Sequence, residues 1–275
     1  MRTATKLTTA VLAAGALTLG LTGCGSDKDA ASDTSGPLVV GASTVPHAEI
    51  LTFLKENLAA KAGLDLDVKE FSDYATLNPA TEDGSVDANY FQNQPYLDEF
   101  NEKNGTDIVP VVTVHLEPLG LYSKKLKSAD ELKSGATIAV PNDTVNEARA
   151  LKLLDANGII TLKDGVGNDA TPKDIAENPK KIEFKELEAA QTPRSLDDVD
   201  AAVINGNYAL EADLSPAKDA LVSESPKDNP YGNFLAVKKD NEADPRVEKL
   251  AKLLTSAEVR KFIEDKYEGS VIASF

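Results

Sequence analysis

Arg149 is the side chain in this sequence best placed to bind an anion. It lies one turn into a helix that the run Thr144-Val-Asn-Glu147 predicts to begin at Thr144, by the pattern of a capping box. Amides at a helix start favour negative charge, and a guanidinium adds a planar two-pronged donor for a carboxylate. Taken alone, Arg149 is explained more simply by an ion pair within the helix or between two parts of the chain.

Two asparagines near Arg149 in the expected fold could hold the other end of an amino acid. Asn205 follows the buried-type strand 199–204, and Asn233 begins the strand-like run 233–239. Open α/β sheets bind ligands at the carboxyl ends of their strands, and amides there can bond both ammonium and carboxylate groups. A single asparagine in such a place is more often a turn residue. The prediction therefore depends on the combination with Arg149.

The stretch GSVDANYFQNQPYLDEF, residues 84–100, gathers aromatic side chains among amides and carboxylates. Four of the chain's 15 Phe and Tyr residues fall in it: Tyr90, Phe91, Tyr96 and Phe100. Pro95 suits the first position of a helix with Asn93 or Gln94 as its N-cap, so that 96 and 100 could both be core positions. Neighbouring residues of a strand point to opposite faces, so at most one of positions 90 and 91 faces a cleft if they lie in a strand.

The residues needed for catalysis or metal binding are few. There are two histidines, His47 and His115, and one cysteine, Cys24. The G-x-S-x-G, H-E-x-x-H and P-loop motifs are absent from the sequence. The two histidines are far apart in the chain, which argues against a zinc site. We predict no enzyme, no metal and no cofactor, and we interpret His47 as a surface or capping residue.

The first residues have the layout of an export signal. A basic start at Arg2 and Lys6 precedes an apolar run, 9–21, that is too short to span a bilayer. The run ends in Leu-Thr-Gly-Cys, which resembles the lipobox of bacterial lipoproteins, in which the cysteine is lipid-modified and becomes the mature N-terminus. Residues 1–23 are then the signal peptide, and Cys24 with the Ser/Asp/Gly-rich residues to 37 forms a lipidated flexible tether. A cleaved signal with an incidental cysteine is the alternative.

The charge of the chain excludes one class of partner. The net charge is −16, and removal of residues 1–23 leaves 27 basic and 45 acidic residues, or −18. Such a surface repels nucleic-acid phosphates and anionic lipid headgroups. We therefore expect attachment to a membrane through the lipid and no nucleic-acid partner.

The body of the chain alternates between strand-like and helical segments. Buried-type runs are expected as strands at 38–42, 65–71, 108–115, 136–140, 181–188, 199–204 and 233–239. Amphipathic helices are expected at 47–63, from 144 to Gly158, and twice after 243. This alternation predicts an α/β fold, and the pieces suggest two lobes.

Several segments together resemble the NlpA-type, methionine-binding lipoproteins that serve ABC importers. They are VPHAEIL (45–51), DANYFQNQPYLD (87–98), HLEPLGLYS (115–123), IAVPNDTVNEARALKLL (138–154), 174–210 and NPYGNFLAV (229–237). The resemblance implies two α/β lobes around a ligand cleft, of the periplasmic-binding-protein type. The first lobe would comprise 38–117 and 231–275, and the second 118–230, with two crossover segments between them.

The resemblance also implies roles for particular residues. Arg149 would clamp the ligand carboxylate, while Asn205 and Asn233 would hold its polar end. The side chain of the ligand would be enclosed by three aromatic residues: Tyr74, Phe91 and Tyr96. Gln92 and Asn93 belong to the same implied site. Family members often carry histidine at the latter position, so Asn93 leaves the preference between L- and D-methionine open.

The function implied is capture of methionine outside the cell membrane by a lipid-anchored, monomeric protein, with delivery to a permease and ATPase complex. Alternatives are a paralogue for another apolar amino acid or a small methionine-containing peptide, an anchored hydrolase, and a structural lipoprotein without ligand.

Overall fold

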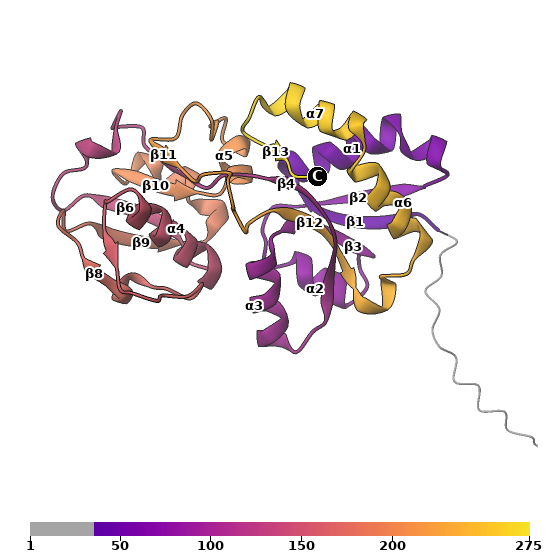
Figure 1. Ribbon diagram of the computed structural model, residues 1–275, viewed down its shortest axis with the longest axis horizontal. Helices are drawn as coiled ribbons and strands as arrows, with labels where there is room; N and C mark the ends of the chain where they lie inside the picture. Colours follow the sequence, from indigo (N-terminus) through magenta and orange to yellow (C-terminus); the bar gives the residue numbers. More distant parts are fainter. Residues whose placement is uncertain (1–35) are drawn as a thin grey trace, which may run out of the picture. The chain divides into compact units, whose positions relative to one another are not determined.

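Two β-sheets form the framework of the protein, whose computed structural model describes residues 36–275. The first sheet has six strands in the order β13-β4-β12-β3-β1-β2, and the second has five in the order β11-β5-β10-β6-β9 (Figure 1). The chain is therefore of the predicted α/β class with two sheets and flanking helices.

The first sheet is built from both ends of the described chain. Its elements are β1 (Leu38–Ser43), α1 (Glu49–Asn57), β2 (Leu66–Phe71), α2 (Leu77–Glu82), β3 (Ala88–Gln92), α3 (Gln94–Asn104), β4 (Ile108–Leu116), β12 (Asn233–Lys238), α6 (Pro245–Leu254), α7 (Ala257–Tyr267) and β13 (Ile272–Ala273). β1 pairs in parallel with β2 and β3, whereas β12 runs antiparallel to β3 and β4.

The second sheet comes from the middle of the chain. Its elements are β5 (Gly120–Tyr122), β6 (Thr137–Pro141), α4 (Thr144–Ala156), β9 (Glu183–Leu187), β10 (Ala201–Ile204), α5 (Gly206–Glu211) and β11 (Val222–Ser223). A separate pair of short strands joins β7 (Thr161–Leu162) to β8 (Ile175–Glu177). β6 runs parallel to both β9 and β10.

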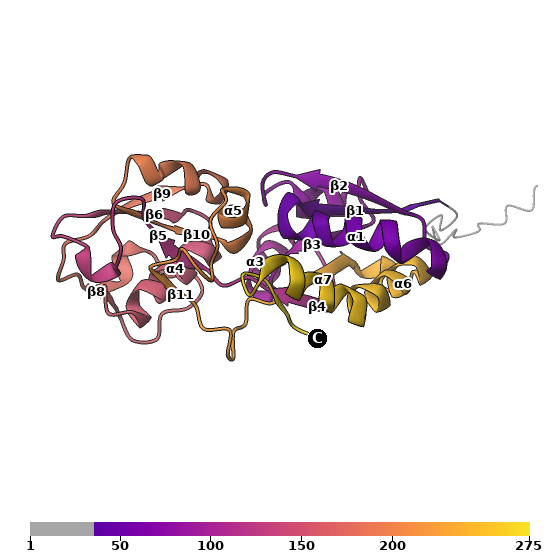
Figure 2. The same cartoon turned by 90° about the horizontal axis from the view of Figure 1, so that it is seen from above.

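Helices cover both faces of the first sheet because its strands carry apolar side chains on both. Leu51 of α1, Leu250 of α6 and Ile263 of α7 are fully buried in one core with Val40 of β1. On the other face α3 packs through Leu97 (Figures 1 and 2). Each fully buried Leu or Ile side chain contributes about 1.5–3 kcal/mol, so these helices hold the sheet rigidly behind the site.

The chain crosses between the two sheets twice. It leaves the first sheet after Leu116 and enters the second at Gly120, then leaves the second after Ser223 and re-enters the first at Asn233. The backbone N–H of Glu224 donates to the carbonyl of Leu119 over 2.9 Å, so the two crossings are tied to each other. The lobe boundaries predicted at 117/118 and 230/231 are a finer division and stay a prediction.

The predicted signal peptide (1–23) and lipidated Cys24 lie outside the described residues, as does the tether apart from 36 and 37. Within residues 36–275, the helices are too short or too polar for any of them to cross a bilayer.

The start of α4 differs from the predicted capping box. Its N-cap is Asp143, whose carboxylate accepts from the backbone N–H of Asn146 over 3.0 Å. A carboxylate satisfies helix-start amides and also favours the positive end of the helix dipole, so Asp takes the cap from the following Thr144. Oε1 of Glu147 is buried without a hydrogen-bond partner in this arrangement, so the capping box is wrong. The predicted end is correct, because Gly158 follows the C-cap with a φ of 68°.

Candidate ligand-binding site

One pocket receives all eight residues that the sequence predicts for ligand binding. It contains about 350 Å³ of space outside the protein atoms and is lined from both sheets. The predicted residues are Tyr74, Phe91, Gln92, Asn93, Tyr96, Arg149, Asn205 and Asn233. Four lining residues were not among them: Glu117, Asn146, Gly206 and Asn207. Part of this space is open solvent at the mouth of the pocket.

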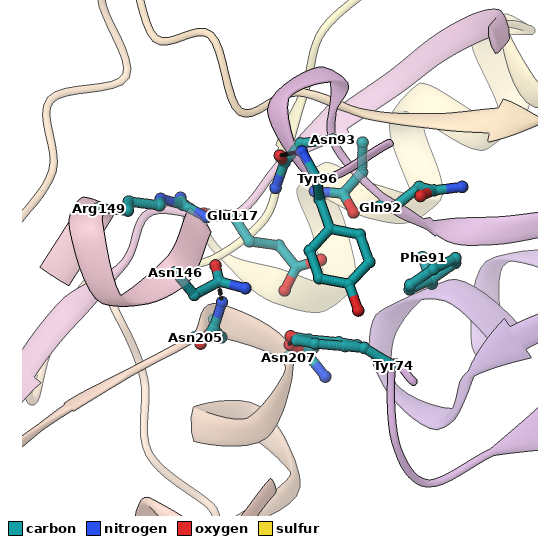
Figure 3. Close-up of a pocket in the computed structure, with 12 residues that line it drawn as sticks. Tyr74, Phe91, Gln92, Asn93, Tyr96, Glu117, Asn146, Arg149, Asn205 and Asn207 are labelled. Atoms are coloured by element: carbon teal, nitrogen blue, oxygen red, sulfur yellow. Dashed lines mark hydrogen bonds between the residues drawn. The ribbon is translucent and has the colours of Figure 1, made fainter. Parts of the chain in front are cut away.

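Three aromatic rings form one wall of the pocket (Figure 3). The ring of Tyr74 lies 5.9 Å from the rings of both Phe91 and Tyr96, and these last two are 5.8 Å apart and nearly perpendicular. They come from the loop after β2, from β3 and from α3. This wall can accept a soft, apolar group, because the three rings present both edges and faces to the pocket.

The aromatic stretch at 84–100 is divided between site and core. Residues 88–92 form β3, so Tyr90 and Phe91 point to opposite faces, as expected for a strand. Tyr90 is fully buried in the core of the first sheet, whereas Phe91 lines the pocket. Asn93 is the N-cap of α3, and its side-chain oxygen Oδ1 accepts from the backbone N–H of Tyr96 over 3.2 Å. Phe100 packs against the core around Leu97.

Gln92 lines the pocket but directs its amide elsewhere. Its nitrogen donates to Asn78 over 2.8 Å and to Asn89 over 2.9 Å, and its oxygen accepts from Asn78 over 2.9 Å. Figure 3 shows the amide turned away from the other polar groups of the pocket. Gln92 therefore braces β3 against α2, and its polar atoms are already satisfied.

Arg149 forms an ion pair with Glu224, which is the simpler explanation that the sequence offers for this arginine, and it also lines the pocket. Nε and Nη2 donate to the two carboxylate oxygens of Glu224 over 2.7 and 2.6 Å, and Nη2 also reaches the backbone carbonyl of Glu117 over 3.2 Å. The guanidinium lies 4.1 Å above the ring of Tyr231. Nη1 makes no hydrogen bond to any residue in 36–275, so that edge is free for an anion.

Three asparagines, Asn146, Asn205 and Asn207, line the pocket beside Glu117 and the aromatic wall. Nδ2 of Asn205 donates to Asn146 over 2.8 Å, while the hydroxyl of Tyr74 donates to Oδ1 of Asn207. The remaining atoms, Oδ1 of Asn205 and Nδ2 of Asn207, are buried without a partner. An unpaired buried acceptor and donor each cost about 1–3 kcal/mol, so a partner for either of these two atoms would stabilise the protein.

Glu117 lies just beyond the end of β4, beside two buried histidines. Its Oε1 is 2.7 Å from Nε2 of His115 and 3.3 Å from Nε2 of His47. Burial raises the pKa of Glu117 to about 7, and it lowers the pKa of His47 to about 4 and of His115 to about 3. Both histidines are therefore neutral near neutral pH, and their contacts with the carboxylate are hydrogen bonds and not ion pairs.

The interpretation of His47 as a surface or capping residue is wrong. Its side chain is 1% exposed, and Nε2 also lies 3.1 Å from Oδ1 of Asn233, which is 186 residues away in the chain. His47, His115 and Glu117 could hold a metal ion by residue type, since their donor atoms lie within 4.8 Å of one another. Nε2 of His47 needs its proton to bond Oδ1 of Asn233, however, and a metal on that nitrogen would displace the proton.

Gly206 allows Glu117 to reach the pocket. A Cβ at 206 would lie 2.6 Å from Cβ of Glu117 and 3.0 Å from its Oε2, which is closer than side-chain carbons approach. The backbone N–H of the next residue, Asn207, favours the ionised form of the same carboxylate and so lowers its pKa. Glycine is thus required for close approach at the start of α5.

Three of the four lining residues that sequence reasoning missed, Glu117, Asn146 and Asn207, carry a recognisable signal. Asn146 and Asn207 neighbour predicted site residues in the same turns. Glu117 lies just after the carboxyl end of a predicted strand, as Asn205 does. The carboxylate was missed because acidic residues are frequent in this chain, and its burial depends on contacts that are distant in sequence.

The chain is similar to known lipoproteins over most of its length. The NlpA lipoprotein family model matches residues 38–275. The methionine-binding lipoprotein MetQ of Bacillus subtilis is 44% identical over 253 residues, which is 90% of this chain and 92% of that protein.

Two solved structures are similar over nearly their whole length. A nutrient-binding protein from Burkholderia cenocepacia, solved bound to methionine, is 48% identical with a TM-score of 0.84, covering 86% of this chain and 100% of that one. A periplasmic substrate-binding protein of an ABC transporter from Coxiella burnetii is 45% identical with a TM-score of 0.82, at 86% and 100% coverage.

Proposed function

The chain belongs to the NlpA lipoprotein family, and on that premise we propose that it captures methionine for an ABC importer. L-methionine is the first candidate ligand and D-methionine the second. The observation that carries the proposal is the pocket itself, in which an aromatic wall faces buried groups able to bond both ends of a zwitterion.

The polar end of the pocket supplies partners of both signs. Burying a zwitterion is costly unless each charge is bonded. The carboxylate of Glu117 and the unpaired Oδ1 of Asn205 would accept from the ammonium group. Nη1 of Arg149 and the unpaired Nδ2 of Asn207 would donate to the ligand carboxylate.

The apolar end of the pocket suits a thioether. Sulfur interacts favourably with aromatic rings by about 0.3–1.5 kcal/mol per contact. Tyr74, Phe91 and Tyr96 offer three rings within 6 Å of one another. A methionine side chain extending from the polar end would reach them, so the same pocket accounts for the whole ligand.

The site has lining residues on both sheets, so ligand binding would hold the two sides together. Phe91 belongs to the first sheet and Asn205 follows β10 of the second. A ligand that contacts both sides better when they are close shifts the population to the closed form. The closed form would then be the one that the permease and ATPase complex accepts.

The remaining parts of the proposal concern the cell. The protein would be anchored on the outer face of the cell membrane by lipid on Cys24, act as a monomer without a cofactor, and catalyse no reaction. Mass spectrometry of the purified chain tests the anchor, because lipidation adds the mass of the acyl groups to the peptide that begins at Cys24.

Calorimetric titration of the protein tests the ligand. The protein is first unfolded, dialysed and refolded to remove any bound molecule, then titrated with each of the twenty amino acids, with D-methionine and with methionine-containing dipeptides. We expect the tightest binding for methionine. Failure to bind either enantiomer would refute the proposal, and tighter binding of another apolar amino acid or a dipeptide would assign the protein to that ligand.

A further inference from the structure

The guanidinium that faces the pocket is already paired with a carboxylate of the protein. Glu224 binds Arg149 side by side through both of its oxygens, over 2.7 and 2.6 Å. The two side chains are 11% and 5% exposed. Burial opposes the charge of Glu224, but Arg149 and other donors hold its pKa below the ordinary value. The pair is thus ionised and close to neutral as a unit.

Glu224 cannot readily leave Arg149 when a ligand arrives. Its Oε2 also accepts from the backbone N–H of Leu119 over 3.0 Å and from Nδ2 of Asn229 over 3.3 Å. Its own N–H donates to the carbonyl of Leu119 over 2.9 Å. These contacts join the two segments that connect the sheets. Moving Glu224 would therefore break hydrogen bonds to both segments.

The carboxylate of Glu117, which lines the same pocket, has no cationic hydrogen-bond partner of this kind in the described part of the chain. Within residues 36–275 the basic side chains in contact with its carboxylate are His47 and His115 alone, and both histidines are neutral near pH 7. Arg149 bonds the backbone carbonyl of Glu117 and not its carboxylate. A ligand ammonium would therefore meet a carboxylate that no cation already bonds, together with the unpaired Oδ1 of Asn205.

We infer that the pocket selects its ligand through the ammonium group more strongly than through the carboxylate, because Glu224 balances the charge of Arg149 in advance. The inference rests on the proposed function and deepens it. The ligand class is α-amino compounds with a methionine-like side chain, including those in which the carboxylate is replaced by a neutral amide. Glu224 is a specificity-determining residue that acts through Arg149.

The test compares two ligands that each lack one charge. L-methioninamide lacks the carboxylate charge, and 4-(methylthio)butanoate lacks the amino group. Affinities for these and for L-methionine are measured with the full chain in detergent. We expect the loss on removing the amino group to exceed the loss on removing the carboxylate charge by about tenfold or more, since a buried carboxylate left unpaired is costly. This comparison uses the unmutated protein, so it does not depend on a variant that folds.

The Glu224→Gln variant tests the cause. Gln keeps the shape of Glu and one acceptor oxygen but no charge, so Arg149 regains its full attraction for the ligand carboxylate. We expect the ratio of methionine affinity to methioninamide affinity to rise roughly fivefold or more, by the Coulomb attraction of a buried charge. Asp197→Asn is the matched control, because it removes an acid on the same lobe whose partner is the exposed Lys124. The ratio should not change there.

The outcomes separate the two proposals. If methionine binds but the loss of affinity is larger for L-methioninamide than for 4-(methylthio)butanoate, this inference is overturned and the proposed function stands. An unchanged ratio in a folded Glu224→Gln variant would also overturn it. No binding of methionine by the unmutated protein would refute the proposed function and the inference with it.

Discussion

Oε1 of Glu117 and Nε2 of the fully buried His115 are hydrogen-bonded over 2.7 Å. Nδ1 of the same ring is bonded by the hydroxyl of Tyr90. If that hydroxyl donates, Nε2 must carry the ring proton, and the neutral imidazole then orients the carboxylate without neutralising it. The carboxylate of Glu117 therefore lies at the pocket without a positively charged hydrogen-bond partner among residues 36–275. A ligand that brings a positive charge would favour its ionised form.

The affinity for methionine should rise with pH up to about 7 and then level off. Burial raises the pKa of Glu117 to about 7 in the protein without ligand, so below that pH it carries a proton. An ammonium group bonds the ionised form, so binding releases the proton and weakens as pH falls, by about tenfold for each pH unit. Titrations between roughly pH 5 and pH 8, in buffers of different ionisation enthalpy, measure both the affinity and the proton released.

The Glu117→Gln variant is the control for this pH dependence. It should bind methionine more weakly at every pH and show no slope in this range. The two histidines do not produce a slope there, because burial lowers their pKa values to about 4 and about 3. A slope that persists in the variant would show that another group releases the proton.

Arg149→Ala should weaken methionine binding well over tenfold. The change removes the donor that faces the pocket and leaves Glu224 buried without its cation, and an unpaired buried charge costs about 3–5 kcal/mol. The free energy of unfolding should fall as well, and both are measured on the same preparation. Arg194→Ala is the control, since Arg194 is exposed on the same lobe.

A double variant separates the two causes of this loss. Replacing Glu224 by Gln in the Arg149→Ala background removes the unpaired charge, so part of the lost stability should return. The affinity for methionine should stay low because the donor is still missing. Near-normal affinity in the single variant would contradict the role of Arg149 as a carboxylate clamp.

The meeting of Arg149 with Asn205 could be predicted because each follows a parallel strand. β6 and β10 are neighbours in the second sheet and end at the same edge. The segments that follow them therefore start side by side, and Asn205 bonds Asn146 over 2.8 Å. Strand alternation predicted opposite faces for Tyr90 and Phe91 only if they lie in a strand. No strand was expected there, and β3 in the structure supplies it.

The partners of His47 and Arg149 could not be predicted from local patterns. His47 contacts Asn233, and Arg149 contacts Glu224, across 186 and 75 residues. Both contacts arise where the two crossing segments pass the pocket. The spacing of residues along one helix or strand carries no information about such contacts, so the buried charge network became visible only in the folded chain.

Phe91→Ala should lower the affinity for methionine with little loss of stability. Phe91 is 4% exposed, and its ring contacts are to Tyr74 and Tyr96 in the pocket wall. Removing the ring deletes an apolar contact for the ligand, a loss of a few kcal/mol at most. Calorimetry gives the affinity, and thermal unfolding without ligand gives the stability.

Leu97→Ala is the matched comparison for Phe91→Ala. Leu97 is fully buried in the core beneath α3 and lies outside the pocket. Its truncation should cost about 2–5 kcal/mol of stability and change the affinity of the folded fraction little. A larger loss of stability for Phe91→Ala than for Leu97→Ala would assign Phe91 to the core.

Asn93 has two functions that different substitutions can separate. Its oxygen caps α3 by accepting from the N–H of Tyr96 over 3.2 Å. Its nitrogen makes no hydrogen bond to any residue in 36–275, and the residue lines the pocket. Asn93→Asp keeps the cap and suits the helix dipole, so stability should be retained. The donor is replaced by a carboxylate that repels the carboxylate of the ligand, so methionine binding should weaken by about tenfold or more.

Asn93→Ala should lower stability by about 1 kcal/mol, because the cap is lost. It removes the donor without adding charge, so its affinity should lie between those of the wild-type protein and Asn93→Asp. Thermal unfolding without ligand and calorimetric titration with methionine distinguish the two effects in each variant. Unchanged affinity in both variants would make Asn93 a helix cap only, and the free nitrogen would then have no part in recognition.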